Sequence, residues 1–199
     1  MAEGIRQPKA TVKLAGYLMK QRATFLDLNG TLVLPIKPQS LSELTLIEGA
    51  GRAIARLSRA GFLCPVVTVQ SRIARGFFSS DDFRKWFYDF STGLRSCGAE
   101  IVGPYVCPHR FRQPCECKKP GTFLYELAAS EHGVDLQRSF VIGDSADDVC
   151  AAYRFGGQGC LVRTENPVEV ERAAPYASFV AESLSKAVDW ILSQSRAGV

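Results

Sequence analysis

The sequence predicts an α/β fold in which helices cover both faces of a mostly parallel, doubly wound sheet. Short apolar runs of strand length alternate with segments of helical periodicity through most of the 199 residues, as in strand–helix–strand units with right-handed crossovers. The length suits one domain with a sizeable core, and 46% hydrophobic with 22% charged residues is ordinary for a globular protein. Two of the apolar runs end in a carboxylate, at Asp27 and Asp144. Because ligands bind beyond the carboxyl ends of the strands in such sheets, the function is expected at that edge.

The first predicted strand leads directly into Asp27. Thr, Phe and Leu occupy positions 24–26, and Gly30 lets the chain turn sharply after the carboxylate. Residues 34–48 contain two prolines and several Ser and Thr side chains, which predicts a loop over the strand ends. An Asp at the end of a strand is also a common structural device of turns, so this segment alone leaves a purely structural role open.

Helices and strands then alternate. Apolar residues at helical spacing predict a helix that begins at residue 50 and ends at Gly61, and residues 62–68 form a buried strand. Ser79 or Ser80 caps a long helix whose apolar stripe is expected to face the core; the stripe consists of Phe83, Trp86, Phe87, Phe90 and Leu94. The remaining predicted elements are strand 99–106, helix 122–132, strand 139–144, helix 145–155, strand 159–163, a Pro-containing loop, a strand near Phe179 and helix 183–194.

Residues 1–22 show no clean periodicity and are predicted to form an N-terminal extension. Residues 23–199 are then a single domain. No internal repeat is evident.

The cysteines indicate a metal site rather than a disulfide framework, because there are seven of them, an odd number. The loop 105–119 contains two pairs of possible ligands, each with one residue between its members. One pair is a Cys and a His, and the other is two cysteines. This spacing can close a tetrahedral Cys₃His zinc site that is structural, since no coordination position stays open. The alternative is a chance cluster of reduced cysteines. The predicted ligands are Cys107, His109, Cys115 and Cys117, while Cys64, Cys97, Cys150 and Cys160 are expected in the core.

Several predicted strand ends carry polar groups that could converge. Two carboxylates in one crevice repel each other unless a cation lies between them, and oxygen ligands favour Mg²⁺. A carboxylate, a metal ion, a hydroxyl and a lysine form a set suited to phosphoryl transfer. Asp27 would attack phosphorus, the metal and Lys119 would neutralise the equatorial oxygens, and Thr68 would orient them.

Four segments occur in a fixed order: Phe25-Leu26-Asp27-Leu28-Asn29-Gly30-Thr31, residues 67–76 (VTVQSRIARG), the cluster from Cys107 to Pro120, and Val141-Ile142-Gly143-Asp144-Ser145-Ala146-Asp147-Asp148. Together they resemble the haloacid dehalogenase (HAD) superfamily, subfamily IIIA. The resemblance is closest to the branch of D,D-heptose 1,7-bisphosphate and histidinol-phosphate phosphatases, and it covers roughly residues 23 to 195. It implies a Rossmann-like, HAD-like core with a zinc loop and no large cap domain.

The resemblance also implies roles for individual residues. Asp27 would be the nucleophile, and Asp27, Asp144 and the backbone carbonyl of Asn29 would bind Mg²⁺. Thr68 and Lys119 would hold the phosphoryl group. Three further residues would lie near the substrate: Gln70, Ser71 and Lys118.

The chain departs from the family pattern at the residue expected to act as acid and base, which is Asn29 here instead of Asp. An amide cannot shuttle a proton near neutral pH, so a slow hydrolase is expected. Val69, Arg72 and Ser145 also depart from the pattern, and the loop 35–38 lacks the polar residues that would grip a heptose. The alternative is a catalytically impaired domain that binds a phosphorylated ligand or a protein partner.

The expected partner is a small phosphorylated sugar or alcohol. The net charge of +4 comes from scattered residues rather than a basic block, which argues against nucleic-acid binding. No run approaches the ~18 apolar residues of a membrane span. A cytoplasmic monomer is therefore the expectation.

Overall fold

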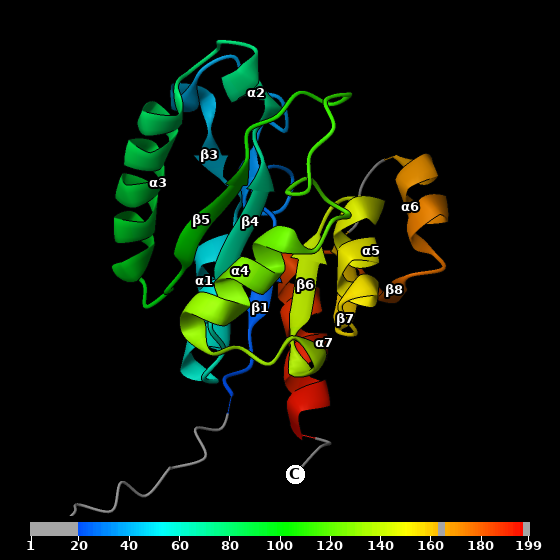
Figure 1. Cartoon of the computed structure of the whole chain (residues 1–199). Helices are drawn as coiled ribbons and strands as arrows, with labels where there is room; N and C mark the ends of the chain where they lie inside the picture. The colour runs from blue at the N-terminus through cyan, green and yellow to red at the C-terminus, as the bar shows by residue number, and fades with distance from the viewer. Residues whose placement is uncertain (1–19, 163–165, 197–199) are drawn as a thin grey trace, which may run out of the picture.

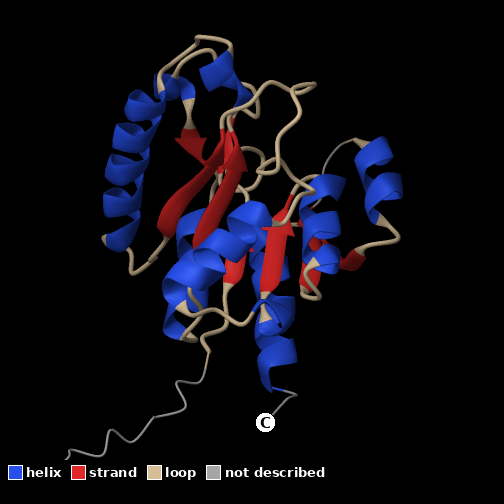
Figure 2. Cartoon of the chain, viewed as in Figure 1, coloured by secondary structure: helices blue, strands red, loops and turns tan. Residues whose placement is uncertain are grey.

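The computed structural model describes residues 20–162 and 166–196. Six strands form one parallel sheet in the order β5-β4-β1-β6-β7-β8 (Figure 2). Their bounds are β1 Thr24–Leu26, β4 Pro65–Val69, β5 Val102–Cys107, β6 Phe140–Gly143, β7 Gln158–Val162 and β8 Ala177–Ala181. The predicted α/β class with a parallel sheet is confirmed.

Helices cover both faces of this sheet because successive strand residues point to opposite sides. Leu26 packs in the cluster with helices α1 (Ala50–Arg59), α3 (Ser80–Arg95) and α7 (Leu184–Arg196), whereas its neighbour Phe25 packs in the cluster with α4 (Phe123–His132) and α5 (Ala146–Arg154). Figure 1 shows α4 and α5 on the near face of the sheet. The helices are α1 Ala50–Arg59, α2 Ser71–Ala74, α3 Ser80–Arg95, α4 Phe123–His132, α5 Ala146–Arg154, α6 Pro167–Ala173 and α7 Leu184–Arg196.

The helix α3 shows how the sequence specifies an element. The Ser79 hydroxyl accepts a hydrogen bond from the Asp82 backbone N–H, and the Asp82 carboxylate accepts one from the Ser79 backbone N–H, which is a capping box. Phe83 and Phe87 are buried, and the partly buried Trp86 stacks on Phe90 with ring centroids 5.0 Å apart. The predicted core role of this stripe is confirmed.

Two segments expected to be loops contain regular structure. Residues 34–48 include β3 (Thr45–Leu46), which pairs antiparallel with β2 (Val33–Leu34), and a 3₁₀ turn at Leu41–Glu43. The helix α6 occupies the Pro-containing segment, because Asn166 caps it and Pro167 stands in its first turn, where a missing N–H costs nothing. The prediction of a loop in this Pro-containing segment is therefore wrong at α6.

Cys97 is exposed rather than in the core, and its thiol donates to the Leu94 carbonyl at 3.0 Å just after α3. The predicted extension, residues 1–22, lies outside the described residues except for its last three. Gln21 forms a parallel bridge with Val134. Among the described residues, no helix is long and apolar enough to cross a membrane.

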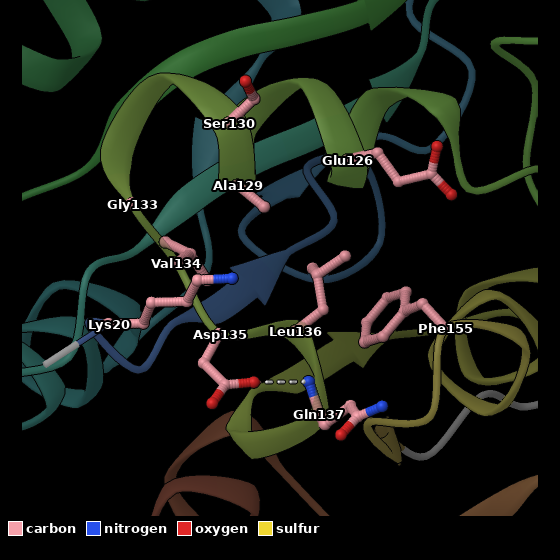
Figure 3. Close-up of a pocket in the computed structure, with 10 residues that line it drawn as sticks. All are labelled: Lys20, Glu126, Ala129, Ser130, Gly133, Val134, Asp135, Leu136, Gln137 and Phe155. Atoms are coloured by element: carbon pink, nitrogen blue, oxygen red, sulfur yellow. Dashed lines mark hydrogen bonds between the residues drawn. The ribbon is translucent and has the colours of Figure 1, made fainter.

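A cavity of about 750 Å³ opens at the amino ends of β1 and β6 (Figure 3). It lies between α4 and the 3₁₀ turn Leu136–Arg138, where the Asp135 carboxylate accepts a hydrogen bond from the Gln137 N–H at 3.1 Å. None of the predicted site residues lines this cavity. The candidate site is at the opposite edge of the sheet.

Candidate active site

Adjacent parallel strands bring the predicted carboxylates together. Asp27 follows β1 and Asp144 follows β6, and the two strands pair with Leu26 opposite Ile142. The Asp27 N–H donates to the Ile142 carbonyl at 2.9 Å, which fixes the backbone where the strands end. Carboxylate oxygens of Asp27, Asp144 and Asp148 all lie within 4.8 Å of one another.

Two glycines make room for these acids. Gly30 has φ +94°, and a Cβ there would lie 2.1 Å from Oδ2 of Asp144. A Cβ on Gly143 would lie 2.2 Å from Cγ of Asp148. Any side chain at either position would collide with a carboxylate, so both glycines are required by the close approach.

Lys119 joins two of the acids. Its ammonium donates to Oδ1 of Asp27 and to Oδ1 of Asp148, each at 2.6 Å, and the residue is only 6% exposed. Burial lowers the pKa of Lys119, but the Asp148 and Asp27 carboxylates outweigh it and hold that pKa well above its usual value. The lysine therefore carries a positive charge into the centre of the site.

The acids carry more negative charge than Lys119 balances. Burial raises the pKa of Asp27 to about 6, although the Lys119 charge opposes the shift. Burial and the charges of Asp27 and Asp148 raise the pKa of Asp144 to about 8. A divalent cation would relieve this repulsion, and an all-oxygen donor set fits Mg²⁺.

Asp148 is the functional candidate to which sequence reasoning assigned no role, although it lies in the fourth family-like segment. One of its oxygens accepts from Lys119, and the other accepts from the Ser145 hydroxyl at 2.6 Å. The signal was the Ser-x-x-Asp capping pattern at the start of α5, which turns the Asp148 side chain back toward the strand end.

A second network holds the side chain of Asn29. Gln70 is 3% exposed, and its Nε2 donates to Oδ1 of Asn29 at 2.6 Å and to Oγ1 of Thr68 at 3.0 Å. Nδ2 of Asn29 donates to the Pro35 carbonyl at 3.3 Å. The amide is thus oriented from both ends. Ser71, the first residue of α2, follows Gln70 and is partly buried.

Lys118 points its ammonium into the loop that precedes it. It donates to the carbonyls of Arg110 and Phe111 at 2.6 Å each and to that of Gln113 at 3.1 Å. An ammonium has three donors, and these three contacts use all of them. Lys118 therefore ties together the loop between the Cys107/His109 and Cys115/Cys117 pairs, and its predicted nearness to the substrate stays a prediction.

The four predicted zinc ligands gather in that loop. Sγ of Cys107 lies 3.7 Å from Sγ of Cys115 and 3.7 Å from Nδ1 of His109, and Nδ1 of His109 lies 3.2 Å from Sγ of Cys117. Tetrahedral bonds of about 2.3 Å to sulfur and about 2.0 Å to nitrogen place ligand atoms about 3.5 to 3.8 Å apart; the two separations of 3.7 Å lie in this range, and the 3.2 Å between His109 and Cys117 is shorter. A disulfide would require about 2.0 Å between sulfurs. The arrangement is consistent with a Cys₃His zinc site.

Comparison with known proteins finds relatives that match most of this chain. A family profile described as HAD-hydrolase-like matches residues 116–187. The D-glycero-beta-D-manno-heptose-1,7-bisphosphate 7-phosphatase of Haemophilus ducreyi is 33% identical over 184 residues, which span 87% of this chain and 100% of that protein. The protein of the same name from Rhodopseudomonas palustris is 36% identical over 174 residues, 78% of this chain and 95% of the relative.

A solved structure shows the same arrangement of elements. The D,D-heptose 1,7-bisphosphate phosphatase of B. bronchiseptica, complexed with magnesium and phosphate, superposes with a TM-score of 0.77 at 28% identity. The match covers 87% of this chain and 99% of that one. Magnesium and phosphate are therefore ligands of a protein with this fold.

Proposed function

Because this chain belongs to the HAD-like hydrolases, as a relative of the D,D-heptose 1,7-bisphosphate phosphatases, we propose that it hydrolyses a phosphate monoester of a small sugar through an aspartyl-phosphate. A D-glycero-D-manno-heptose 1,7-bisphosphate-like compound is the proposed substrate. The observation that carries the proposal is Lys119, buried between Asp27 and Asp148 and beside Asp144.

Asp27 is the nucleophile. Its Oδ1 accepts the hydrogen bond from Lys119, which leaves Oδ2 to attack phosphorus. The bond from Oδ2 to phosphorus forms as the ester P–O bond breaks, and the sugar oxygen takes a proton from solvent water and leaves as an alcohol. Water then attacks the aspartyl-phosphate, inorganic phosphate departs, and Asp27 is restored.

The neighbouring groups stabilise the charge that develops on the phosphoryl oxygens. The Lys119 ammonium has one hydrogen left after its bonds to Asp27 and Asp148, and the Thr68 hydroxyl offers a further donor. The carboxylates of Asp27 and Asp144, with the carbonyl of Asn29, would hold Mg²⁺. When bound, that ion supplies Lewis-acid stabilisation of the same oxygens.

Asn29 limits the rate in this proposal. Its amide can donate a hydrogen bond to the leaving oxygen but cannot give up a proton, and general acid–base catalysis typically contributes ~10²–10⁴-fold. Turnover of a sugar phosphate should be slow. An aryl phosphate should react with less penalty, because its leaving group needs less protonation.

The zinc loop is structural in this proposal. A closed Cys₃His site stiffens residues 107–117, and the bonds from Lys118 complete the ordering of the loop. Lys119 follows this loop directly, so the loop fixes the backbone position of that lysine.

The second candidate is a catalytically impaired domain that binds a phosphorylated ligand or a protein partner, and Asn29 favours it. Phosphate release from heptose 1,7-bisphosphate, histidinol phosphate and p-nitrophenyl phosphate, with Mg²⁺, separates the two. Slow release supports the hydrolase. Release of no phosphate from any substrate, together with ligand-induced stabilisation, supports the binding domain.

The substitution Asn29→Asp sharpens this test. The new carboxylate can still accept the hydrogen bond from Gln70, whereas its other oxygen can donate to the Pro35 carbonyl only when it is protonated. We expect the sugar phosphate rate to rise by about 10²-fold or more. An unchanged rate would show that the missing acid is not what limits turnover.

A further inference from the structure

The helix α6 packs against the first turns of α5, the helix that carries Asp148. Ala173 of α6 is fully buried and lies in one apolar cluster with Ala146 and Val149 of α5. Figure 1 shows α6 beside α5, at the side of the sheet where β7 and β8 lie. Because Ala146 stands midway between Asp144 and Asp148 in the sequence, α6 contacts the stretch of backbone that carries both acids.

The first backbone N–H groups of α5 need acceptors other than the helix's own carbonyls, as at the start of every α-helix. The Ser145 N–H donates to Oδ2 of Asp148 at 3.3 Å, within the capping box. The next donor finds its acceptor in α6, because the Ala146 N–H donates to Oε2 of Glu169 at 2.8 Å. The helix dipole also favours a carboxylate at this position. Glu169 therefore caps α5 from a different helix.

An arginine holds the Glu169 carboxylate in this position. Nη1 of Arg172 donates to Oε1 of Glu169 at 2.7 Å, and Nη2 of Arg172 donates to Oδ1 of Asp147 at 3.0 Å. The Arg172 side chain is 52% exposed, so these ion pairs contribute little to the free energy of unfolding. Their effect is geometric, because the planar guanidinium fixes the Glu169 carboxylate relative to Asp147, the residue that follows Ala146.

The capped turn sets the directions of two acids of the candidate site. Asp148 has contacts of its own, since its oxygens accept from Lys119 and from the Ser145 hydroxyl, each at 2.6 Å. Asp144 differs: among the hydrogen bonds between described residues, none joins its carboxylate to another side chain. The direction of the Asp144 carboxylate therefore depends on the backbone between β6 and α5, which Glu169 holds at Ala146.

We propose that Glu169 is a positioning residue for the Mg²⁺ site. By accepting the Ala146 N–H it holds the first turn of α5, and through that turn it fixes the direction in which Asp144 presents its carboxylate to the metal ion. Arg172 acts one step further out, by orienting Glu169. The inference rests on the proposed function, in which Asp144 binds Mg²⁺. Groups that orient metal ligands typically change metal affinity by about 10- to 100-fold when they are removed.

The test measures the Kd for Mg²⁺ by isothermal titration calorimetry of the purified full chain without substrate. Glu169→Ala should raise this Kd by about tenfold or more. Glu169→Gln keeps an oxygen that can accept from the Ala146 N–H, so its Kd should stay within about threefold of the wild-type value. Glu171→Ala is the matched control, because it removes one exposed negative charge from the same helix, and no ion pair between described residues involves Glu171. Its Kd should stay within about twofold.

Arg172→Gln separates positioning from net charge. If only the charge near the site mattered, the loss of a positive charge would tighten Mg²⁺ binding. Positioning predicts the opposite, because a Glu169 carboxylate without its partner holds the Ala146 N–H less firmly, and the Kd should rise by about threefold, the scale of one hydrogen bond. Tighter binding by Arg172→Gln, or a Kd of Glu169→Ala within about twofold of the wild type, would overturn the proposal.

Thermal unfolding checks that each variant is folded at the temperature of the titration, and if Glu169→Ala is not, Arg172→Gln decides. Phosphate release by the wild type is measured separately. A wild type that binds Mg²⁺ but releases no phosphate refutes the proposed hydrolase, while a raised Kd in Glu169→Ala still supports the positioning role. A wild type that releases phosphate, with an equal Kd in Glu169→Ala, refutes the role of Glu169 alone.

Discussion

Replacing Lys119 by Met tests the charge balance of the site. Met has a similar length and no charge, so the variant leaves the Asp27 and Asp148 carboxylates facing each other in a buried site. Breaking a buried ion pair by removing one partner costs about 3 to 5 kcal/mol. With a urea m value of about 2 kcal/mol/M, the unfolding midpoint should fall by about 1.5 to 2.5 M at pH 8.

The assay is urea unfolding followed by tryptophan fluorescence, with Lys186→Met as the control. Lys186 is exposed, and its 3.9 Å contact with Asp189 should contribute less than about 0.5 kcal/mol. The double variant Lys119→Met/Asp148→Asn removes one of the two carboxylates that have lost their cation, so it should recover part of the lost stability. At pH 5 the loss should shrink, because the uncompensated Asp27 can take up a proton. A midpoint shift below about 0.5 M at pH 8 would refute the idea that Lys119 neutralises these acids.

Three further predictions concern the metals and the turn after Asp27. The folded-state pKa values of Asp27 (about 6) and Asp144 (about 8) lie above the ordinary 3.8, so the metal-free protein should lose stability as pH rises from 4 to 9. Mg²⁺ should accordingly raise the Tm more at pH 8.5 than at pH 5.5. A larger rise at pH 5.5, measured by calorimetry, would contradict the charge argument. Elemental analysis should find one zinc per chain, lost in Cys115→Ser with a lower Tm but retained in Cys97→Ser, which removes an exposed cysteine outside the cluster. Gly30→Ala should abolish phosphatase activity and lower the Tm, because its Cβ would meet Asp144. The control is Gly61→Ala, at a position with a similar positive φ of +80° but open space, and it should lower stability without loss of kcat. Equal activities of the two variants would argue against the steric reason.

Much of the fold could be predicted because its signals are local. Apolar runs and helical spacing gave the six strands of the sheet and the long helices, and the Ser79 capping pattern gave the start of α3. The errors fell where one signal has two meanings. Pro167 can break a helix or begin one, and only its position after a capping Asn decides.

The sequence predicted which residues gather at the candidate site better than it predicted the contacts between them. The strand-end positions of Asp27 and Asp144 and the Cys/His spacing were enough to group these residues. The pairing of Lys119 with Asp148 depends on the register of β1 and β6 and on the turn of α5. The direction of the Lys118 ammonium depends on the path of the zinc loop.

The sequence by itself determined the alternation of strands and helices, the carboxylates at the strand ends and the Cys/His spacing that predicts a zinc site. These follow from periodicity and spacing, which act within a few residues. The tertiary structure alone decided which distant charges meet. Lys119 forms an ion pair with Asp27 across 92 residues of chain, because the parallel crossovers return the strand ends to the same edge of the sheet.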